Sequence, residues 1–317
     1  TKIHCLNGPK LKGSACFETC PICNLYSGHT ISIEKPLSVS SSQGRITKRK
    51  DILMQDLFSI KGKVALITGG SRGIGEMIAA GFLASGAKVY ISARKADVCN
   101  ETAKRLSEMY DAECISIPAN LADMAGIDAV VKEISAREDK LDILVNNAGA
   151  SWGAPIEEFP EMGWDKVMDV NVKSVFFLTQ KMLPLLEAAA SHEDPARVIN
   201  IGSVDGIKSP SFETFSYGPS KAAVHHLTRI LANHLIKRNI ICNAIAPGPF
   251  PTWMLSTGVG FGGETDVDWT AVGKSNPRGR VGTMEDIAGL AIFLSSRAGA
   301  YTVGEVITCD GGSVAAS

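Results

Sequence analysis

Short apolar runs alternate with longer amphipathic stretches from Leu57 to Asp310, and this alternation is the main pattern of the chain. The runs are rich in Val, Ile and Leu and are bounded by polar residues or glycine, as is typical of buried strands. Seven strands are predicted, at 63–68, 88–92, 113–117, 142–146, 197–201, 240–245 and 305–309. Helices are predicted between them, at about 75–85, 97–110, 124–138, 164–190, 217–237 and 284–295.

Strands that alternate with helices predict an α/β fold. The connections should be right-handed and should place helices on both faces of one parallel sheet. We therefore expect a single Rossmann-type, doubly wound parallel sheet of about seven strands. Ligands of such sheets bind at the carboxyl ends of the strands. The residues directly after each strand are consequently the first candidates for function.

A glycine-rich loop follows the first predicted strand. It reads Thr68-Gly-Gly-Ser-Arg-Gly-Ile-Gly75 and leads into an apolar-periodic helix. Glycines permit a tight turn and close backbone approach, and a helix N-terminus favours a pyrophosphate. The spacing is Gly-x3-Gly-x-Gly instead of G-x-G-x-x-G, and an isolated glycine loop can be an ordinary turn. The flanking strand and helix favour nucleotide binding.

The end of the second predicted strand bears on the choice of nucleotide. Sites that prefer NAD place an acid there to bind the ribose 2′-hydroxyl. This chain has Ala93 and Arg94 instead, and Arg72 lies inside the glycine loop. Two guanidinium groups suit a 2′-phosphate, which predicts NADP. The alternative is that both arginines are solvated surface residues.

Tyr217 and Lys221, within YGPSK, are the candidates for proton chemistry. On a helix this spacing puts the phenol and the ammonium on one face. The pKa of a free tyrosine is about 10, and a nearby lysine charge favours the phenolate, which lowers that pKa. Ser203 can hold a carbonyl oxygen at the same point. The three residues fit protonation of a carbonyl, although YxxxK alone can arise by chance on an amphipathic helix.

Seven motifs in order give the chain its resemblance to a known family. They are TGGSRGIG (68–75), NNAG (146–149), Asn171 in DVNVKS, Ser203, YGPSK (217–221), APGPFPT (246–252) and GEVITCDGG (304–312). The chain resembles the short-chain dehydrogenase/reductase family, and residues 57–313 cover essentially the whole family domain. Within the family it is most similar to 3-oxoacyl-(acyl-carrier-protein) reductases, and among them to the subgroup first linked to rhamnolipid synthesis.

The resemblance implies a catalytic tetrad of Asn171, Ser203, Tyr217 and Lys221. Tyr217 would give its proton to the carbonyl oxygen, Ser203 would orient that oxygen, and Asn171 would hold a water that links Lys221 to solvent. Asn171 can equally be a helix residue bonded to the backbone. The implied NADP contacts are Gly69, Ser71, Arg72, Gly73, Ile74, Gly75, Arg94, Asn120, Leu121, Asn147, Ala148, Gly149, Tyr217, Lys221, Pro247, Gly248 and Thr252.

One position departs from the family pattern. Many relatives have an acid after the third strand, where this chain has Asn120. Its side-chain carbonyl can still accept a hydrogen bond from the adenine amino group. Asp123, three residues later, is interpreted as a helix cap.

The resemblance favours an NADPH-dependent ketone reductase that acts on a 3-oxoacyl thioester, which a carrier protein can present. The alternatives are a dehydrogenase for another ketone, such as a sugar, steroid or xenobiotic, and a non-catalytic scaffold subunit with the same fold. A homotetramer, or failing that a homodimer, is expected through the two long helices after Trp164 and Tyr217. The apolar run at 175–186 is wider than one core-facing stripe needs, which agrees with a second buried face.

Composition and charge exclude other classes of protein. A net charge of −1 gives no support to nucleic-acid binding, and no stretch is long and apolar enough to span a membrane. Cys99, Cys114, Cys242 and Cys309 lack the spacing of a disulfide framework and are predicted to be reduced thiols. An intracellular location is therefore expected. The cytoplasm is favoured, and a mitochondrial or plastid matrix is the alternative.

Residues 1–53 differ from the rest of the chain. They hold eight Lys or Arg against three acids, four of the eight cysteines, and little periodicity. Cys20 and Cys23 have zinc-ligand spacing, but no second pair completes a metal signature, so no metal is predicted. A targeting peptide and a leader before a natural start at Met54 are the other interpretations, and the leader is favoured. The predicted domain is 54–317, and deletion of the extension 1–53 should leave catalysis intact.

Overall fold

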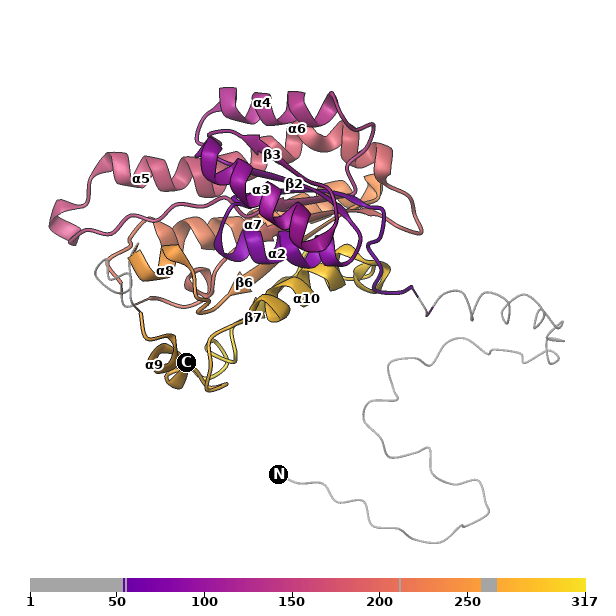
Figure 1. Ribbon diagram of the computed structural model, residues 1–317. Helices are drawn as coiled ribbons and strands as arrows, with labels where there is room; N and C mark the ends of the chain where they lie inside the picture. Colours follow the sequence, from indigo (N-terminus) through magenta and orange to yellow (C-terminus); the bar gives the residue numbers. More distant parts are fainter. Residues whose placement is uncertain (1–53, 55, 211, 258–266) are drawn as a thin grey trace, which may run out of the picture. The chain divides into compact units, whose positions relative to one another are not determined.

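The computed structural model describes residues 54, 56–210, 212–257 and 267–317. The predictions for the extension 1–53 lie outside the described residues. Seven parallel strands form one sheet in the order β3-β2-β1-β4-β5-β6-β7 (Figure 1). The strands are β1 (Val64–Thr68), β2 (Lys88–Ala93), β3 (Cys114–Pro118), β4 (Ile143–Asn146), β5 (Ala196–Ile201), β6 (Ile240–Pro247) and β7 (Val306–Cys309). The predicted α/β fold is confirmed.

Helices cover both faces of this sheet. The main ones are α2 (Gly73–Ala84), α3 (Ala96–Tyr110), α4 (Met124–Ser135), α6 (Ser174–Ala189), α7 (Tyr217–Leu235) and α10 (Met284–Ser295). Alternate residues of each strand point to opposite faces. Ala65 and Ile67 of β1 therefore pack in the cluster that includes α2, α3 and α10. Leu66 packs in the other cluster, with α4, α6 and α7.

The helix predicted over 164–190 consists of three parts. It begins three residues earlier as α5 (Glu161–Met168), directly after Pro160. A π-helical turn at Asp169–Lys173 follows, and α6 continues from Ser174. The sequence prediction joined these parts into one helix, because a single π turn adds only one residue to an otherwise continuous helical stretch. The π turn contains Asn171.

A buried polar network ties the central strands to the helices of one face. Asn146 of β4 donates to Thr179 Oγ1 at 3.1 Å and to Asn200 Oδ1 at 2.9 Å. Asn200 of β5 in turn donates to Thr228 Oγ1 of α7 at 2.9 Å. Each of these buried amide groups thus has a partner, as low-dielectric surroundings require. The network fixes the carboxyl ends of β4 and β5 relative to α6 and α7.

The other predictions about the chain concern its surface and cysteines. Among the described residues, no helix combines the length and the apolar content needed to cross a membrane. Cys99, Cys114, Cys242 and Cys309 are free thiols, and the first three are buried. The short helices α8 (Trp253–Thr257) and α9 (Trp269–Lys274) were not predicted. Residues 258–266, which connect them in the sequence, are not among the described residues.

Candidate active site

The glycine loop at the end of β1 is shaped by contacts that leave no room for side chains. Gly69 and Gly73 have φ values of +64° and +58°, which favour glycine. A Cβ on Gly75 would lie 2.3 Å from Asn147 Nδ2 and 2.4 Å from the Gly69 carbonyl oxygen. The Asn147 amide holds the loop by donating to the carbonyls of Thr68 and Gly69, at 2.8 and 3.1 Å. The result is a closely packed loop of backbone in front of α2.

The N-terminus of α2 meets the requirements of a dinucleotide pyrophosphate. Its N-cap residue, Arg72, is extended, and no side chain in the described chain caps the helix by a hydrogen bond. The first N–H groups are therefore free to bind an anion, and the helix dipole adds to this preference. Ser71 and Ile74 belong to the same turn. The residues present therefore fit a bound dinucleotide.

The two arginines predicted to bind a 2′-phosphate lie after neighbouring strands. Thr68 of β1 is in register with Ser92 of β2, so the loops that carry Arg72 and Arg94 start side by side. Arg94 is exposed, and no hydrogen bond or ion pair to a described residue holds its guanidinium. The Arg72 guanidinium lies 5.9 Å from the ring centroid of Trp253, a cation–π contact. Arg94 is thus the less constrained of the two.

The segment after β3 has its polar side chains bonded to one another. Asn120 donates to Asp123 Oδ2 at 3.1 Å, and its own Oδ1 accepts from Ala122 N at 3.4 Å. Asp123 accepts from Gly126 N at 2.8 Å, which confirms the predicted cap of α4. The Leu121 side chain is buried in the core. If Leu121 contacts a cofactor, it must do so through its backbone.

Ser203, Tyr217 and Lys221 come together at the carboxyl end of β5. Tyr217 begins α7 and forms a hydrogen bond with Ser203. The Lys221 Nζ atom lies 5.5 Å from the centroid of the Tyr217 ring. It donates to the carbonyl oxygen of Ile201, two residues before Ser203, at 2.8 Å. The Ser203 hydroxyl, the Tyr217 phenol and the Lys221 amine are therefore close together at the carboxyl ends of the central strands.

The ionisation of this group differs from the prediction. Lys221 was expected to lower the pKa of Tyr217, but burial and the nearby Asp205 carboxylate raise the pKa of Tyr217 to about 12. The Ser203 hydrogen bond opposes this shift in part. Burial lowers the pKa of Lys221 to about 8, and the Asp205 charge opposes that shift. The expected direction for Tyr217 is therefore wrong here, because loss of solvent disfavours the charged form of both groups.

Asn171 uses its side chain to fix the loop after β4. Its Oδ1 accepts from Ala150 N at 2.8 Å, and its Nδ2 donates to Ala150 O at 3.0 Å and to Ser220 Oγ at 2.9 Å. A Cβ on Gly149 would lie 3.5 Å from Asn171 Oδ1 and 3.7 Å from Lys221 Nζ. The structure therefore brings Asn171 close to Lys221. The alternative interpretation, a side chain bonded to the backbone, describes two of its three hydrogen bonds.

Two loops that were predicted to contact the cofactor flank this region. Ala148 N and Asn147 N both donate to Thr68 Oγ1 at 2.9 Å, which joins the end of β4 to the glycine loop. Pro247 ends β6, and Gly248 N donates to the Cys309 carbonyl at 3.0 Å. A Cβ on Gly73 would lie 3.2 Å from Thr252 Cγ2, so the loop after β6 lies against the glycine loop.

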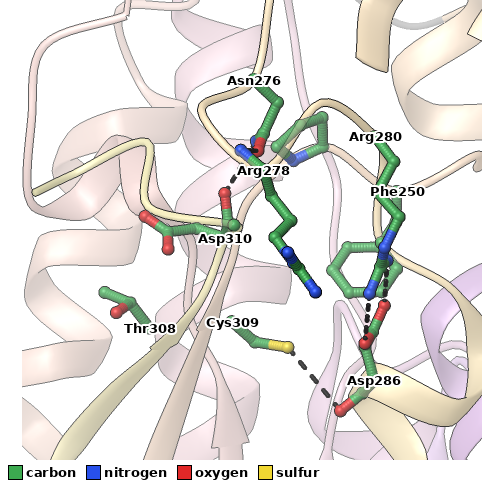
Figure 2. Close-up of a pocket in the computed structure, with 11 residues that line it drawn as sticks. Phe250, Asn276, Arg278, Arg280, Asp286, Thr308, Cys309 and Asp310 are labelled. Carbon is green, nitrogen blue, oxygen red and sulfur yellow. Dashed lines mark hydrogen bonds and ion pairs between the residues drawn. The ribbon is translucent and has the colours of Figure 1, made fainter. Parts of the chain in front are cut away.

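A hollow of about 260 Å³ lies beside the loop after β6 (Figure 2). Phe250, Arg278, Arg280 and Cys309 are among its lining residues, and none of the predicted site residues lines it. Arg280 forms a bidentate pair with Asp286, at 2.5 and 2.9 Å. The described residues contain no group of three or more His, Cys, Asp or Glu side chains that could bind a metal ion.

Sequence reasoning missed two residues of the site. Thr68 Oγ1 accepts the two N–H groups of the loop after β4 and donates to Val145 O at 3.3 Å. Asp205, two residues after Ser203, is half-buried, and burial raises the pKa of its carboxyl. Its position two residues after Ser203 was the available signal, but only the structure reveals its charge next to Tyr217 and Lys221.

Comparison with known proteins identifies the family of the chain. A sequence profile described as enoyl-(acyl carrier protein) reductase matches residues 69–314. The chain is 49% identical, over 259 residues, to the rhamnolipids biosynthesis 3-oxoacyl-[acyl-carrier-protein] reductase of Pseudomonas aeruginosa, which spans 82% of this chain and 99% of that protein. The chain belongs to the short-chain dehydrogenase/reductase family. The predicted family is thus confirmed, and the chain is an oxidoreductase of CH–OH or C=O groups.

Relatives within the family differ in their substrates. The Pseudomonas aeruginosa RhlG/NADP active-site complex superposes with a TM-score of 0.76 at 49% identity, over 82% of this chain and 100% of that one. The L-sorbose reductase of Gluconobacter frateurii, complexed with NADPH and L-sorbose, gives a TM-score of 0.73 at 30% identity, over 81% and 98%. The gluconate 5-dehydrogenase of Gluconobacter oxydans is 37% identical over 81% of this chain and 96% of its own length.

Proposed function

We propose that this short-chain dehydrogenase/reductase reduces the ketone of a 3-oxoacyl thioester to the 3-hydroxyacyl thioester with NADPH. The observation that carries the proposal is the cluster of Ser203, Tyr217 and Lys221 at the same end of the sheet as an uncapped helix N-terminus. A dinucleotide bound at α2 would reach this cluster along the carboxyl edge of the sheet. NADP is the cofactor, in agreement with relatives that bind it.

Each residue of the cluster has a distinct role in this proposal. Bound NADPH supplies the hydride. Tyr217 keeps its proton at neutral pH, because its pKa is about 12, and can donate it as the carbonyl oxygen gains negative charge. Ser203 hydrogen-bonds that oxygen and orients it. Lys221, with a pKa of about 8, is mostly charged at pH 7 and stabilises the phenolate that remains.

Asn171 supports this cluster from the π turn. Through Ser220 and the Ala150 backbone it fixes both α7 and the loop after β4. We propose that its turn also holds a water through which Lys221 is reprotonated. The glycine loop, Asn147, Ala148, Gly149, Pro247, Gly248 and Thr252 would contact the cofactor, and Arg94 and Arg72 its 2′-phosphate.

The 3-oxoacyl substrate rests on the relative with 49% identity, which is named for that reaction. A ketose or keto-acid sugar is the second candidate, because relatives with 30–37% identity are named for L-sorbose and gluconate. Asp205 also favours this candidate, since a half-buried carboxylate can accept hydrogen bonds from sugar hydroxyls. An apolar acyl chain offers no such partner.

Turnover of the full chain with NADPH tests the proposal. We expect kcat/KM for 3-oxoacyl thioesters to exceed that for 5-ketogluconate or L-sorbose by at least tenfold. The reverse order would replace the thioester with a sugar ketone. Tyr217→Phe should lower kcat by roughly 10²–10⁴-fold while NADPH still binds. A wild-type protein that binds NADPH but reduces no ketone of either class would favour the scaffold alternative.

We also propose a homotetramer, or failing that a homodimer, formed through α6 and α7. Phe176 on α6 and Ile230 on α7 are 37% and 43% exposed, so apolar side chains remain on the outer faces of both helices. Burial of these faces against a second copy would follow the symmetric pairing common among enzymes. Sedimentation of a monomer at micromolar concentration would contradict this proposal.

A further inference from the structure

His225 is a buried residue of α7 that the proposed chemistry does not use. It lies one helical turn after Lys221, and only 5% of its surface is exposed. Its neighbour His226 is exposed. A polar, titratable ring at such a buried position requires hydrogen-bond partners. Those partners lie in the segment that carries Ser203.

The imidazole contacts the backbone on both sides of Ser203. Its Nε2 accepts a hydrogen bond from Ser203 N at 3.4 Å. A Cβ on Gly202 would lie 2.1 Å from Nε2, and a Cβ on Gly206 would lie 2.8 Å from Cε1. The ring therefore occupies the space that side chains at 202 and 206 would need. Glycine is required at both positions for this close approach.

The hydrogen bond defines the state of the ring. A nitrogen that accepts from an N–H carries no proton, so His225 is neutral with its proton on Nδ1. Burial, followed by the charges of Lys221 and Arg229, lowers the pKa of His225 to about 4, and a hydrogen bond with the Gly206 backbone opposes this shift. The neutral ring is therefore the stable form at all pH values at which the enzyme is expected to work.

Ser203 is consequently fixed from both of its ends. Its Oγ accepts from Asp205 N at 3.1 Å within the short helix at Val204–Gly206, and its N–H is held by His225. The lysine and the histidine share one helix, so movement of Ser203 relative to α7 would break the contact with His225. An apolar side chain of similar size would fill the space but would offer Ser203 N no acceptor.

We propose that His225 is a positioning residue for the reduction, which sets the distance of the Ser203 hydroxyl from Tyr217 by accepting the Ser203 N–H. The inference rests on the proposed ketone reduction but not on the identity of the substrate. A misplacement of a reacting group by about 1 Å can cost on the order of 100-fold in rate. Loss of the acceptor should therefore appear in kcat and not in the affinity for NADPH.

Three variants of the full chain test this role. His225→Leu keeps the apolar volume and removes the acceptor, and we expect kcat to fall by roughly 10–100-fold. His225→Gln places an amide oxygen near the position of Nε2, and it should retain kcat within about threefold of wild type. His226→Leu is the matched control on the exposed side of the same helix and should leave kcat unchanged. NADPH affinity, measured by fluorescence titration, should be the same in all four proteins.

The pH dependence and the ring nitrogens give readouts that a purely structural role would not change. The Ser203 hydrogen bond lowers the pKa of Tyr217. Loss of this bond in His225→Leu should therefore raise that pKa. In the reverse reaction, alcohol oxidation, Tyr217 must be ionised, so the pH profile of that reaction should move to higher pH. Nitrogen NMR of the wild-type protein should show an unprotonated Nε2 on His225. Equal losses in the Leu and Gln variants, near-normal activity in both, or a protonated Nε2 would overturn the inference. Absence of ketone reduction by wild type would instead refute the proposed function, and the NMR result would still decide the hydrogen bond.

Discussion

Replacement of Lys221 by Met should make the protein more stable while it abolishes turnover. The ammonium is buried, with 5% of the residue's surface exposed, and the pKa falls from 10.5 to about 8 on folding. Each pKa unit corresponds to about 1.4 kcal/mol, so the buried charge opposes folding by about 3 kcal/mol at neutral pH. Met removes the charge and keeps most of the side-chain volume.

The hydrogen bond that Lys221 makes reduces the expected gain. Its Nζ donates to Ile201 O at 2.8 Å, and the loss of that bond costs about 1 kcal/mol. The net stabilisation should be about 2 kcal/mol, which corresponds to a melting temperature higher by roughly 4–8 °C for a domain of this size. An uncharged side chain at this position, which we propose to be catalytic, should thus favour stability over activity.

The pH dependence gives the prediction its sign. Below pH 8 Lys221 is charged in both states, and the destabilisation is fully present. Between pH 8 and 10.5 the folded protein binds fewer protons than the unfolded chain, so the stability of wild type rises with pH. Met does not titrate, so the difference in the free energy of unfolding between the variant and wild type should shrink over this range. Urea denaturation without nucleotide at pH 7 and pH 10 measures both differences. A variant less stable than wild type at pH 7, or a difference independent of pH, would refute the reasoning.

Three other substitutions, one of them with a matched control, test the cofactor site and the charges. Arg94→Asp should raise the KM for NADPH by roughly 10–100-fold and leave that for NADH within a few-fold, as steady-state kinetics will show. Gly75→Ala introduces a Cβ 2.3 Å from a neighbouring amide nitrogen and should weaken NADPH binding at least about tenfold. Gly289→Ala, which meets nothing within 4 Å on α10, is its control and should slightly stabilise the helix. Asp205→Asn removes a charge that, after burial, raises the pKa of Tyr217, so the pH profile of alcohol oxidation should move to lower pH.

The strands and the Ser203, Tyr217 and Lys221 cluster could be predicted because their signals are local or follow from the fold. A buried strand is a short apolar run, and the topology of a doubly wound sheet brings the strand ends together. The direction of the shift in the Tyr217 pKa could not be predicted, since it depends on how much solvent the folded site loses. The contact of His225 with Ser203 joins residues 22 positions apart and has no sequence signature. For the same reason the sequence predicts neither the effect of the Asp205 charge on Tyr217 and Lys221 nor the hydrogen bonds of Thr68.

The π turn at Asp169–Lys173 has a consequence for how the chain tolerates changes in its length. A π turn holds one more residue than the regular helix around it, so it is equivalent to a one-residue insertion in a single long helix. Removal of one residue there would restore an unbroken α-helix and rotate the segments on its two sides by about 100° relative to each other. Ala150 and Ser220 would then lose the Asn171 amide that links them. A one-residue deletion in the middle of a helix would thereby break the Asn171 contacts of the proposed catalytic centre without removing any residue of the seven strands.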